Sequence, residues 1–118
     1  MSALIDTLTT APAGSRELDA DVAEAAGWKK GIHHGSSQYQ RQDGRWFFNV
    51  PAFTTSLDAT FAEAQRREWH IVAGNGHYEK DTSVAVVWLS PSKPPYHGEG
   101  QTPALAACAA LIAAVEAG

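Results

Sequence analysis

The chain has 118 residues, of which 44% are hydrophobic and 19% are charged, and its formal net charge is -4. This length and composition predict a single folded domain over residues 1–118 and exclude an intrinsically disordered chain. The mildly negative net charge argues against a broad surface that binds the phosphate groups of DNA or RNA, so a nucleic acid is not an expected partner. No apolar run approaches the roughly 20 residues needed to span a bilayer, and no basic signal-peptide start is present, so no membrane association is expected.

Two helices are predicted in the first quarter of the chain. The second should begin at Ser15, a favourable N-cap, and end at Gly27, a natural helix stop. Acidic residues follow Ser15 in the first turn, where the helix dipole favours negative charge. The first, shorter helix is indicated by apolar residues at helical spacing before Pro12, namely Leu4, Ile5 and Leu8.

A β-hairpin is predicted in the second quarter. Residues 29–37 are polar and rich in glycine, which is typical of a loop. The strands of the hairpin should cover 38–42 and 45–50, joined by Asp43-Gly44, because glycine accepts the positive φ of a tight turn. Pro51 should end the second strand, since proline cannot donate a ladder hydrogen bond.

A third helix and two more strands are predicted before residue 90. The helix should begin at Thr55 as N-cap, with Asp58 three residues later in a start that resembles a capping box. One strand is predicted over 69–73. The other, over 83–89, is almost continuously apolar, which favours a central strand buried on both faces.

The last part of the sequence predicts a loop and a final helix. Residues 90–101 hold three prolines and two glycines, which indicate the loop. Thr102 should cap the helix, with Pro103 at its first position. This helix is apolar on nearly all sides, so it is either buried on several sides or packed against a partner. We expect a homo-oligomer through this helix or the sheet, and we expect Cys108, among alanines, to be a small buried residue.

The predicted order is α-α-β-β-α-β-β-α. Hairpins imply antiparallel pairing, so the predicted fold class is α+β, with a mainly antiparallel four-stranded sheet.

Three separated motifs look like the phage ABA sandwich domain family, whose members are small phage and prophage proteins. They are residues 14–20 (GSRELDA) with Trp28, residues 51–59 (PAFTTSLDA) and residues 102–111 (TPALAACAAL). A weaker likeness extends to lambdoid phage Nin-region proteins. The resemblance implies a three-layer αβα sandwich and a phage origin, which would place the protein in the cytoplasm of a bacterial host. It supplies no catalytic residues, and neither the hairpin nor segment 90–101 belongs to the resemblance.

No metal site, cofactor site or catalytic signature is predicted. A zinc site needs three or four converging ligands, and neither His33-His34 nor the other histidines have ligand spacing. The Gly-x-Gly at residues 74–76 leads to another predicted strand, so it indicates a hairpin connection rather than a dinucleotide fingerprint. A small hydrolase that uses Ser36 or Ser37 with these histidines remains an alternative, although no nucleophile elbow surrounds the serines.

A pocket for a small anion is the main functional hypothesis. The segments Thr54-Thr55-Ser56 and Gln101-Thr102 each open a predicted helix, where free N–H groups and the dipole favour an anion. Core placement is favoured for all four tryptophans, with stacking on a ligand ring as the alternative for Trp28, Trp46 or Trp69. Further donors come from the glycine-rich loops and the hairpin, namely His33, His34, Ser36, Ser37, Arg41, Arg45 and His97. The competing explanation is plain helix capping beside flexible loops.

The sequence therefore favours a non-enzymatic phage-encoded binding protein without a cofactor. Its ligand would be a small anionic molecule such as a nucleotide signal, sequestered to defeat a host defence. A protein–protein adaptor or inhibitor with an apolar surface is the rival hypothesis.

Overall fold

The structure is a computed structural model that describes residues 3–75, 83–90 and 93–117. Within these residues the chain forms helices α1 (Ala3–Thr10), α2 (Arg16–Ala25), α3 (Leu57–Arg66) and α4 (Pro103–Ala117). The strands are β1 (Lys29–His33), β2 (Ser36–Gln40), β3 (Trp46–Phe47), β4 (His70–Asn75), β5 (Ser83–Trp88) and β6 (Tyr96–Gly100). The predicted α+β class with antiparallel pairing is confirmed. The predicted single four-stranded sheet is wrong, because β1–β3 form one antiparallel sheet and β4–β6 form another.

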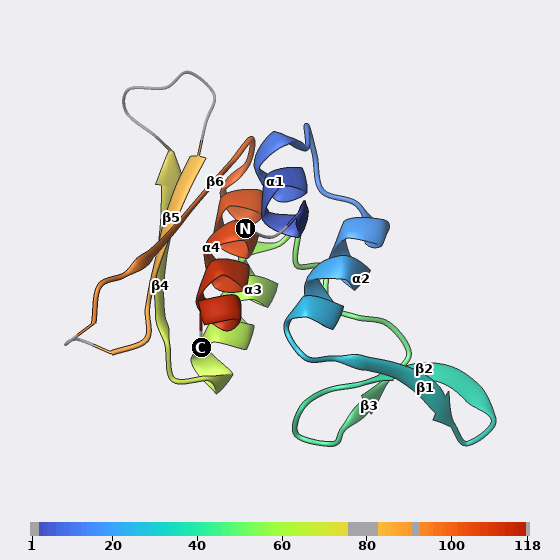
Figure 1. Ribbon diagram of the computed structural model, residues 1–118. Helices are drawn as coiled ribbons and strands as arrows, with labels where there is room; N and C mark the ends of the chain where they lie inside the picture. Colours follow the sequence, from blue (N-terminus) through green and yellow to red (C-terminus); the bar gives the residue numbers. More distant parts are fainter. Residues whose placement is uncertain (1–2, 76–82, 91–92, 118) are drawn as a thin grey trace.

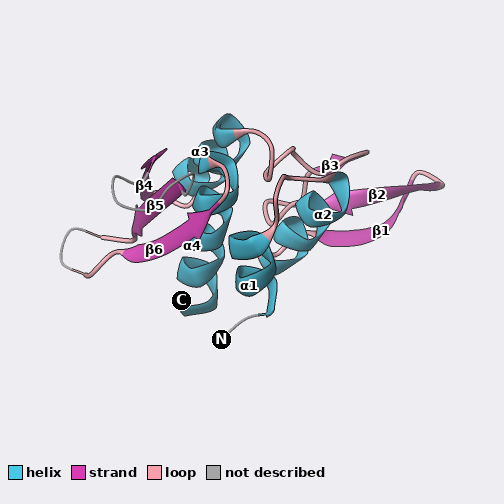
Figure 2. Ribbon diagram, turned by 90° about the horizontal axis from the view of Figure 1, so that it is seen from above, coloured by secondary structure: helices cyan, strands magenta, loops and turns pink. Residues whose placement is uncertain are grey.

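The helices lie between the two sheets, as the views in Figures 1 and 2 show. Sheet β4–β6 packs one face on α4, while α1 and α3 contact other sides of that helix. The opposite face of the sheet carries the exposed side chains of Val72 and Val84. This arrangement differs from the expected sandwich, in which helices cover both faces of a single sheet. None of the helices among the described residues is long and apolar enough to cross a membrane.

Helix α4 is apolar all round because two cores meet on it. Two of its larger side chains, Leu105 and Ile112, pack with Phe53 and the residues of α1 and α2. Its alanines at 106, 107, 110 and 114 pack instead against Ala85 and Val87 of β5. The apolar surface of α4 is therefore buried within the chain, which removes the reason for expecting that helix to form an oligomer contact. Cys108 is buried among these residues as predicted, and burial raises the pKa of its thiol to about 12.

Four residues were predicted to begin or end a helix, and three of these predictions, for Ser15, Gly27 and Thr102, are confirmed. The Ser15 side chain accepts a hydrogen bond from the Leu18 N–H, and Gly27 follows α2 with a φ of 101°. The Thr102 hydroxyl accepts from the Leu105 N–H at 3.2 Å. The predicted Thr55 cap is wrong, because α3 begins one residue later, with Ser56 at the cap position and no side-chain cap hydrogen bond.

Sheet β1–β3 contains one confirmed hairpin and one that the sequence analysis missed. β2 pairs with β3 across the turn that holds Asp43-Gly44, although β2 begins and ends two residues earlier than predicted and β3 is shorter than predicted. The predicted loop at 29–37 is wrong, because β1 and β2 pair over this segment. The two residues that join them, His34 and Gly35, have φ values of 50° and 79°, as a tight two-residue hairpin turn requires.

In the second sheet, β5 is central as predicted, but it is not buried on both faces. Its side chains alternate, so that Val87 is buried and Val84 is 38% exposed. Trp88 is half-buried and belongs to neither core cluster, contrary to expectation.

The predicted loop at 90–101 is also wrong, because it contains β6. Gly98 and Gly100 face α4, and a Cβ atom at either position would clash with that helix. The Gly-x-Gly at 74–76 begins in β4, and residues 76–82 of the predicted connection lie outside the described residues.

Candidate functional site

The first sheet carries an aromatic stack that begins at Trp46 on β3. The Trp46 indole is parallel to the His33 imidazole on β1, with ring centroids 4.6 Å apart and an interplanar angle of 6°. Between these strands, β2 contributes Gln38, whose amide donates to the His33 carbonyl oxygen at 2.9 Å. The indole edge also approaches Gly31, where a Cβ atom would lie 3.2 Å from the ring. A glycine at this position therefore leaves room for the tryptophan to reach across the sheet.

Beside this stack lies an open cavity of about 650 Å³, which we call the Trp46 pocket. Phe48, which follows β3, lines this cavity and is 70% exposed. A second imidazole, His34, lies 4.1 Å from His33 in an edge-to-face arrangement. The lining residues are His33, His34, Ser36, Gln38, Gly44, Arg45, Trp46, Phe47 and Phe48.

The chemistry of this lining suits an aromatic anion. Trp46 and Phe48 offer ring faces for stacking, and Arg45 supplies a permanent positive charge. Among the described residues, the Arg45 side chain has no hydrogen bond or ion pair, so its N–H groups are available to a ligand. Among the described residues, no carboxylate lines the Trp46 pocket; the nearby Asp43 carboxylate accepts from the Arg45 backbone N–H at 3.2 Å and lines the neighbouring cavity. The pocket can therefore hold a flat ring at one end and a negative group at the other.

The structure brings together some of the residues that the sequence analysis proposed. His33, His34, Ser36, Arg45 and Trp46 all line the Trp46 pocket. They converge because β1, β2 and β3 are adjacent in one sheet and alternate residues of a strand share a face. Ser37 points to the opposite face of β2 from Ser36 by the same rule. Arg41 lies over the Phe47 ring, at 5.0 Å from its centroid, and lines a different cavity.

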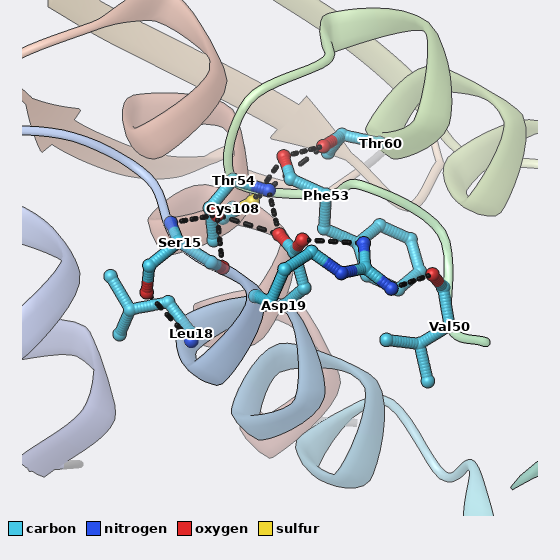
Figure 3. A network of polar contacts seen from close by, with 9 residues as sticks. Ser15, Leu18, Asp19, Val50, Phe53, Thr54, Thr60 and Cys108 are labelled. Atoms are coloured by element: carbon cyan, nitrogen blue, oxygen red, sulfur yellow. Dashed lines mark hydrogen bonds and ion pairs between the residues drawn. The ribbon is translucent and has the colours of Figure 1, made fainter.

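Thr54 has a structural role that the sequence analysis mistook for a binding role. Its N–H and its hydroxyl both donate to the buried Asp19 carboxylate, at 2.8 and 2.6 Å (Figure 3). The Ser15 N–H in turn donates to the Thr54 hydroxyl oxygen at 3.0 Å. Thr54 is only 1% exposed. These bonds occupy the groups that were expected to hold an anion.

The remaining proposed residues do not line the Trp46 pocket. Thr55 is exposed before α3, and Ser56 is half-buried at the cap position. Thr102 caps its own helix, which is the plain capping role that competed with ligand binding. His97 and Gln101 are exposed in and after β6, in the other sheet. The two helix starts do not meet in the Trp46 pocket, and their convergence into a pocket of their own stays a prediction.

The three motifs behind the family resemblance meet in one buried network. Ser15 and Asp19 come from the first motif and Thr54 from the second (Figure 3). Cys108, from the third motif, donates from its thiol to the Phe53 carbonyl oxygen at 3.0 Å. Their contacts join α2 to the segment that precedes α3, and join that segment to α4. The three motifs therefore stabilise the fold rather than form a binding site.

Four residues that line the pocket were not predicted as site residues, namely Gln38, Gly44, Phe47 and Phe48. Gln38 was assigned only to a strand, and Phe48 was taken as part of a longer strand. The alternation of Ser36 and Gln38 along one strand could have placed them on the same face. Phe48 carried no such signal, because an exposed position for a large apolar ring is not visible in local sequence.

A second exposed feature is the outer face of sheet β4–β6. Val72 is 59% exposed and pairs with Val86, which pairs in turn with His97. Val84 lies two pairs further along β5, on the same face. This row of valines leaves an apolar strip on the surface.

Comparisons with protein-family models, with curated proteins and with solved structures give no match to this chain. The resemblance to phage ABA sandwich proteins therefore stays a prediction, and the candidate site depends on geometry and chemistry alone.

Proposed function

We propose that this chain is a non-enzymatic, phage-encoded binding protein that holds a small aromatic anion, of the nucleotide class, in the Trp46 pocket. The observation that carries the proposal is the parallel stack of Trp46 on His33 beside an Arg45 side chain that has no ion pair among the described residues. In this proposal the ligand is a nucleotide signal, and its capture blocks a host defence. The phage origin draws its support from the three sequence motifs alone.

Stacking is the first part of the argument. His33 fixes the orientation of the Trp46 ring, so little side-chain entropy is lost when a ligand ring lies against it. A base stacked on an aromatic side chain contributes about 1–3 kcal/mol. Phe48, at 70% exposure, loses water-exposed apolar surface when a ring covers it, which adds to the same effect.

Charge is the second part. Arg45 can donate two parallel hydrogen bonds to a phosphate, and the His33 and His34 imidazoles and the Ser36 hydroxyl add donors to the same wall. No side-chain hydrogen bond joins Ser36 or Ser37 to either histidine in the part of the chain that the structure describes. The pair that a serine hydrolase would need is therefore not assembled there, which favours binding over catalysis.

Calorimetry with a panel of cyclic nucleotides and ADP-ribose derivatives tests the proposal. At least one compound should bind the wild-type chain, and Trp46→Ala and Arg45→Gln should each weaken binding by about tenfold or more, for the loss of roughly 1.4 kcal/mol. Lys30→Gln is the matched control, because Lys30 is an exposed cation of the same sheet outside the pocket. The absence of binding across the panel, or equal affinity in all variants, contradicts the proposal.

A protein–protein adaptor is the second candidate function, favoured by the apolar strip of Val72, Val84 and Val86. Val72→Lys with Val84→Lys should abolish a stoichiometric complex with a host or phage protein, or self-association through the sheet. Pull-down from infected host lysate and sedimentation measure these outcomes. A variant that retains the complex excludes this face, whereas a nucleotide that copurifies with the wild-type chain favours the first candidate.

A further inference from the structure

A second cavity, of about 410 Å³, lies between the end of α3 and the turn that joins β2 to β3. We call it the arginine cavity. Three guanidinium groups line it, from Arg41 on the turn and from Arg66 and Arg67 on and after α3. Two carboxylates, Asp43 and Glu63, complete the charged lining.

Glu63 organises one side of the cavity. Its side chain is 2% exposed and accepts hydrogen bonds from the Trp28 indole at 3.2 Å and from Arg67 at 2.9 Å. Arg66 donates to the same carboxylate. One carboxylate therefore faces two guanidinium groups. Because Asp43 offsets only Arg41, the cavity keeps an excess of one positive charge.

The guanidinium groups are held in place before any ligand arrives. Arg67 also donates to the Ala26 carbonyl oxygen and lies 5.2 Å from the Trp69 ring centroid. Arg41 makes two hydrogen bonds to Asp43, at 3.0 and 2.6 Å, and lies over Phe47. The Arg41 guanidinium lowers the pKa of Asp43 to about 2, so this pair stays ionised at neutral pH. Binding an anion here would cost little side-chain entropy.

Several donors remain unused. Each guanidinium has five N–H groups. Among the described residues, no hydrogen bond occupies Nη1 of Arg41 or Arg67, or Nε and Nη1 of Arg66. These groups belong to side chains on both sides of the cavity. A ligand that satisfies them needs acceptor oxygens in more than one direction, which a tetrahedral phosphate has and a planar carboxylate lacks.

We propose that the arginine cavity is a second, independent binding site for a phosphate-type oxyanion, held between the guanidinium groups of Arg41, Arg66 and Arg67. It is separate from the Trp46 pocket, because the two cavities share no lining residue. The excess of a single positive charge predicts weak binding. The same chemistry fits inorganic phosphate and the phosphate group of an ester.

Titration followed by ³¹P NMR and by thermal melting tests this proposal. Inorganic phosphate, methyl phosphate and dimethyl phosphate are compared with sodium chloride and sodium acetate at equal ionic strength. A phosphate compound should raise Tm above the chloride and acetate values and broaden its own ³¹P signal. If only inorganic phosphate does so, the ligand is the free ion, whereas a similar effect of an ester indicates a phosphorylated molecule.

Arg66→Gln is the informative variant, because this side chain is one-third exposed and its loss should leave the fold intact. It should weaken phosphate binding by about tenfold, the loss of roughly one charge-assisted hydrogen bond. Arg66→Lys keeps the positive charge but lacks the parallel N–H donors of a guanidinium, so it should weaken binding less. This variant replaces Arg66→Gln if Arg66→Gln fails to fold. Lys30→Gln removes an exposed cation outside both cavities and should bind phosphate as the wild type does.

The site is excluded if phosphate compounds act no differently from chloride, or if both Arg66 variants bind as the wild type does. It is also excluded if Arg45→Gln alone abolishes phosphate binding, since the phosphate would then lie in the Trp46 pocket. Failure of the nucleotide panel leaves this proposal standing, because the two sites share no lining residue.

Discussion

Trp46 and His33 come from the two edge strands of one sheet and stack across the central strand, with their ring planes 6° apart. Gly31 makes room for this contact, because its α-carbon carries no side chain beneath the indole. The stack therefore depends on a residue that contributes no binding group of its own.

Gly31→Ala should displace Trp46. The new Cβ atom would lie 3.2 Å from the indole, which is tighter than an ordinary van der Waals contact, so the ring must move by a few tenths of an ångström. We expect a loss of about 1 kcal/mol in the free energy of unfolding, and weaker binding of any ligand of the Trp46 pocket. Urea unfolding and calorimetry measure the two effects. Lys30→Ala, at the next position of β1, serves as control, and an equal effect of both variants would refute the role of Gly31.

Asp19→Ala should be strongly destabilising. The carboxylate is fully buried and accepts from the Thr54 N–H, the Thr54 hydroxyl and Arg16. Its removal leaves buried donors without acceptors, at a cost of about 3 kcal/mol in the free energy of unfolding. Asp21→Ala, at an exposed position of the same helix, should change that value by less than about 0.5 kcal/mol. Similar values for the two variants in urea unfolding would show that the network has no structural importance.

Gly98→Ala should disrupt the contact between β6 and α4. The added methyl group would clash with the backbone nitrogen of Ala110 and the backbone oxygen of Ala106, neither of which can move without shifting the helix. We expect a loss of about 3 kcal/mol and a lower Tm in a thermal melt. His97→Ala, on the exposed side of the same strand, should leave Tm nearly unchanged. A tolerated alanine at position 98 would mean that β6 does not pack on α4 this closely.

Because of Cys108, the free energy of unfolding should decrease at alkaline pH. Burial raises the pKa of its thiol from an ordinary 9.0 to about 12, so the folded state disfavours the thiolate. The stabilising contribution is complete below pH 9 and is lost as pH rises toward 12, at up to about 1.4 kcal/mol per pH unit. The difference in the free energy of unfolding between wild type and Cys108→Ala, measured across this range, should shrink accordingly. A difference that stays constant with pH contradicts the burial of the thiol.

Local signals predicted the helix ends well, because a cap joins residues close together in the chain. Ser15 and Leu18 are three residues apart, as are Thr102 and Leu105. The same locality misled the prediction for Thr54. Its hydroxyl could serve as a helix-start donor, but it bonds instead to Asp19, 35 residues away in the sequence. Only the packing of α2 beside the segment before α3 reveals that partner.

From the sequence alone it was possible to predict the caps of α2 and α4, the Asp43-Gly44 hairpin turn, the central strand β5 and the apolar character of α4. These depend on residues that are neighbours along the chain. The tertiary structure determined that strands form within segments 29–37 and 90–101, because their polar and glycine residues gain ladder hydrogen bonds only when a partner strand lies beside them. It also decided the candidate site. Trp46 reaches His33 only across a sheet, and Arg41 meets Arg66 only where a hairpin turn lies against a helix end.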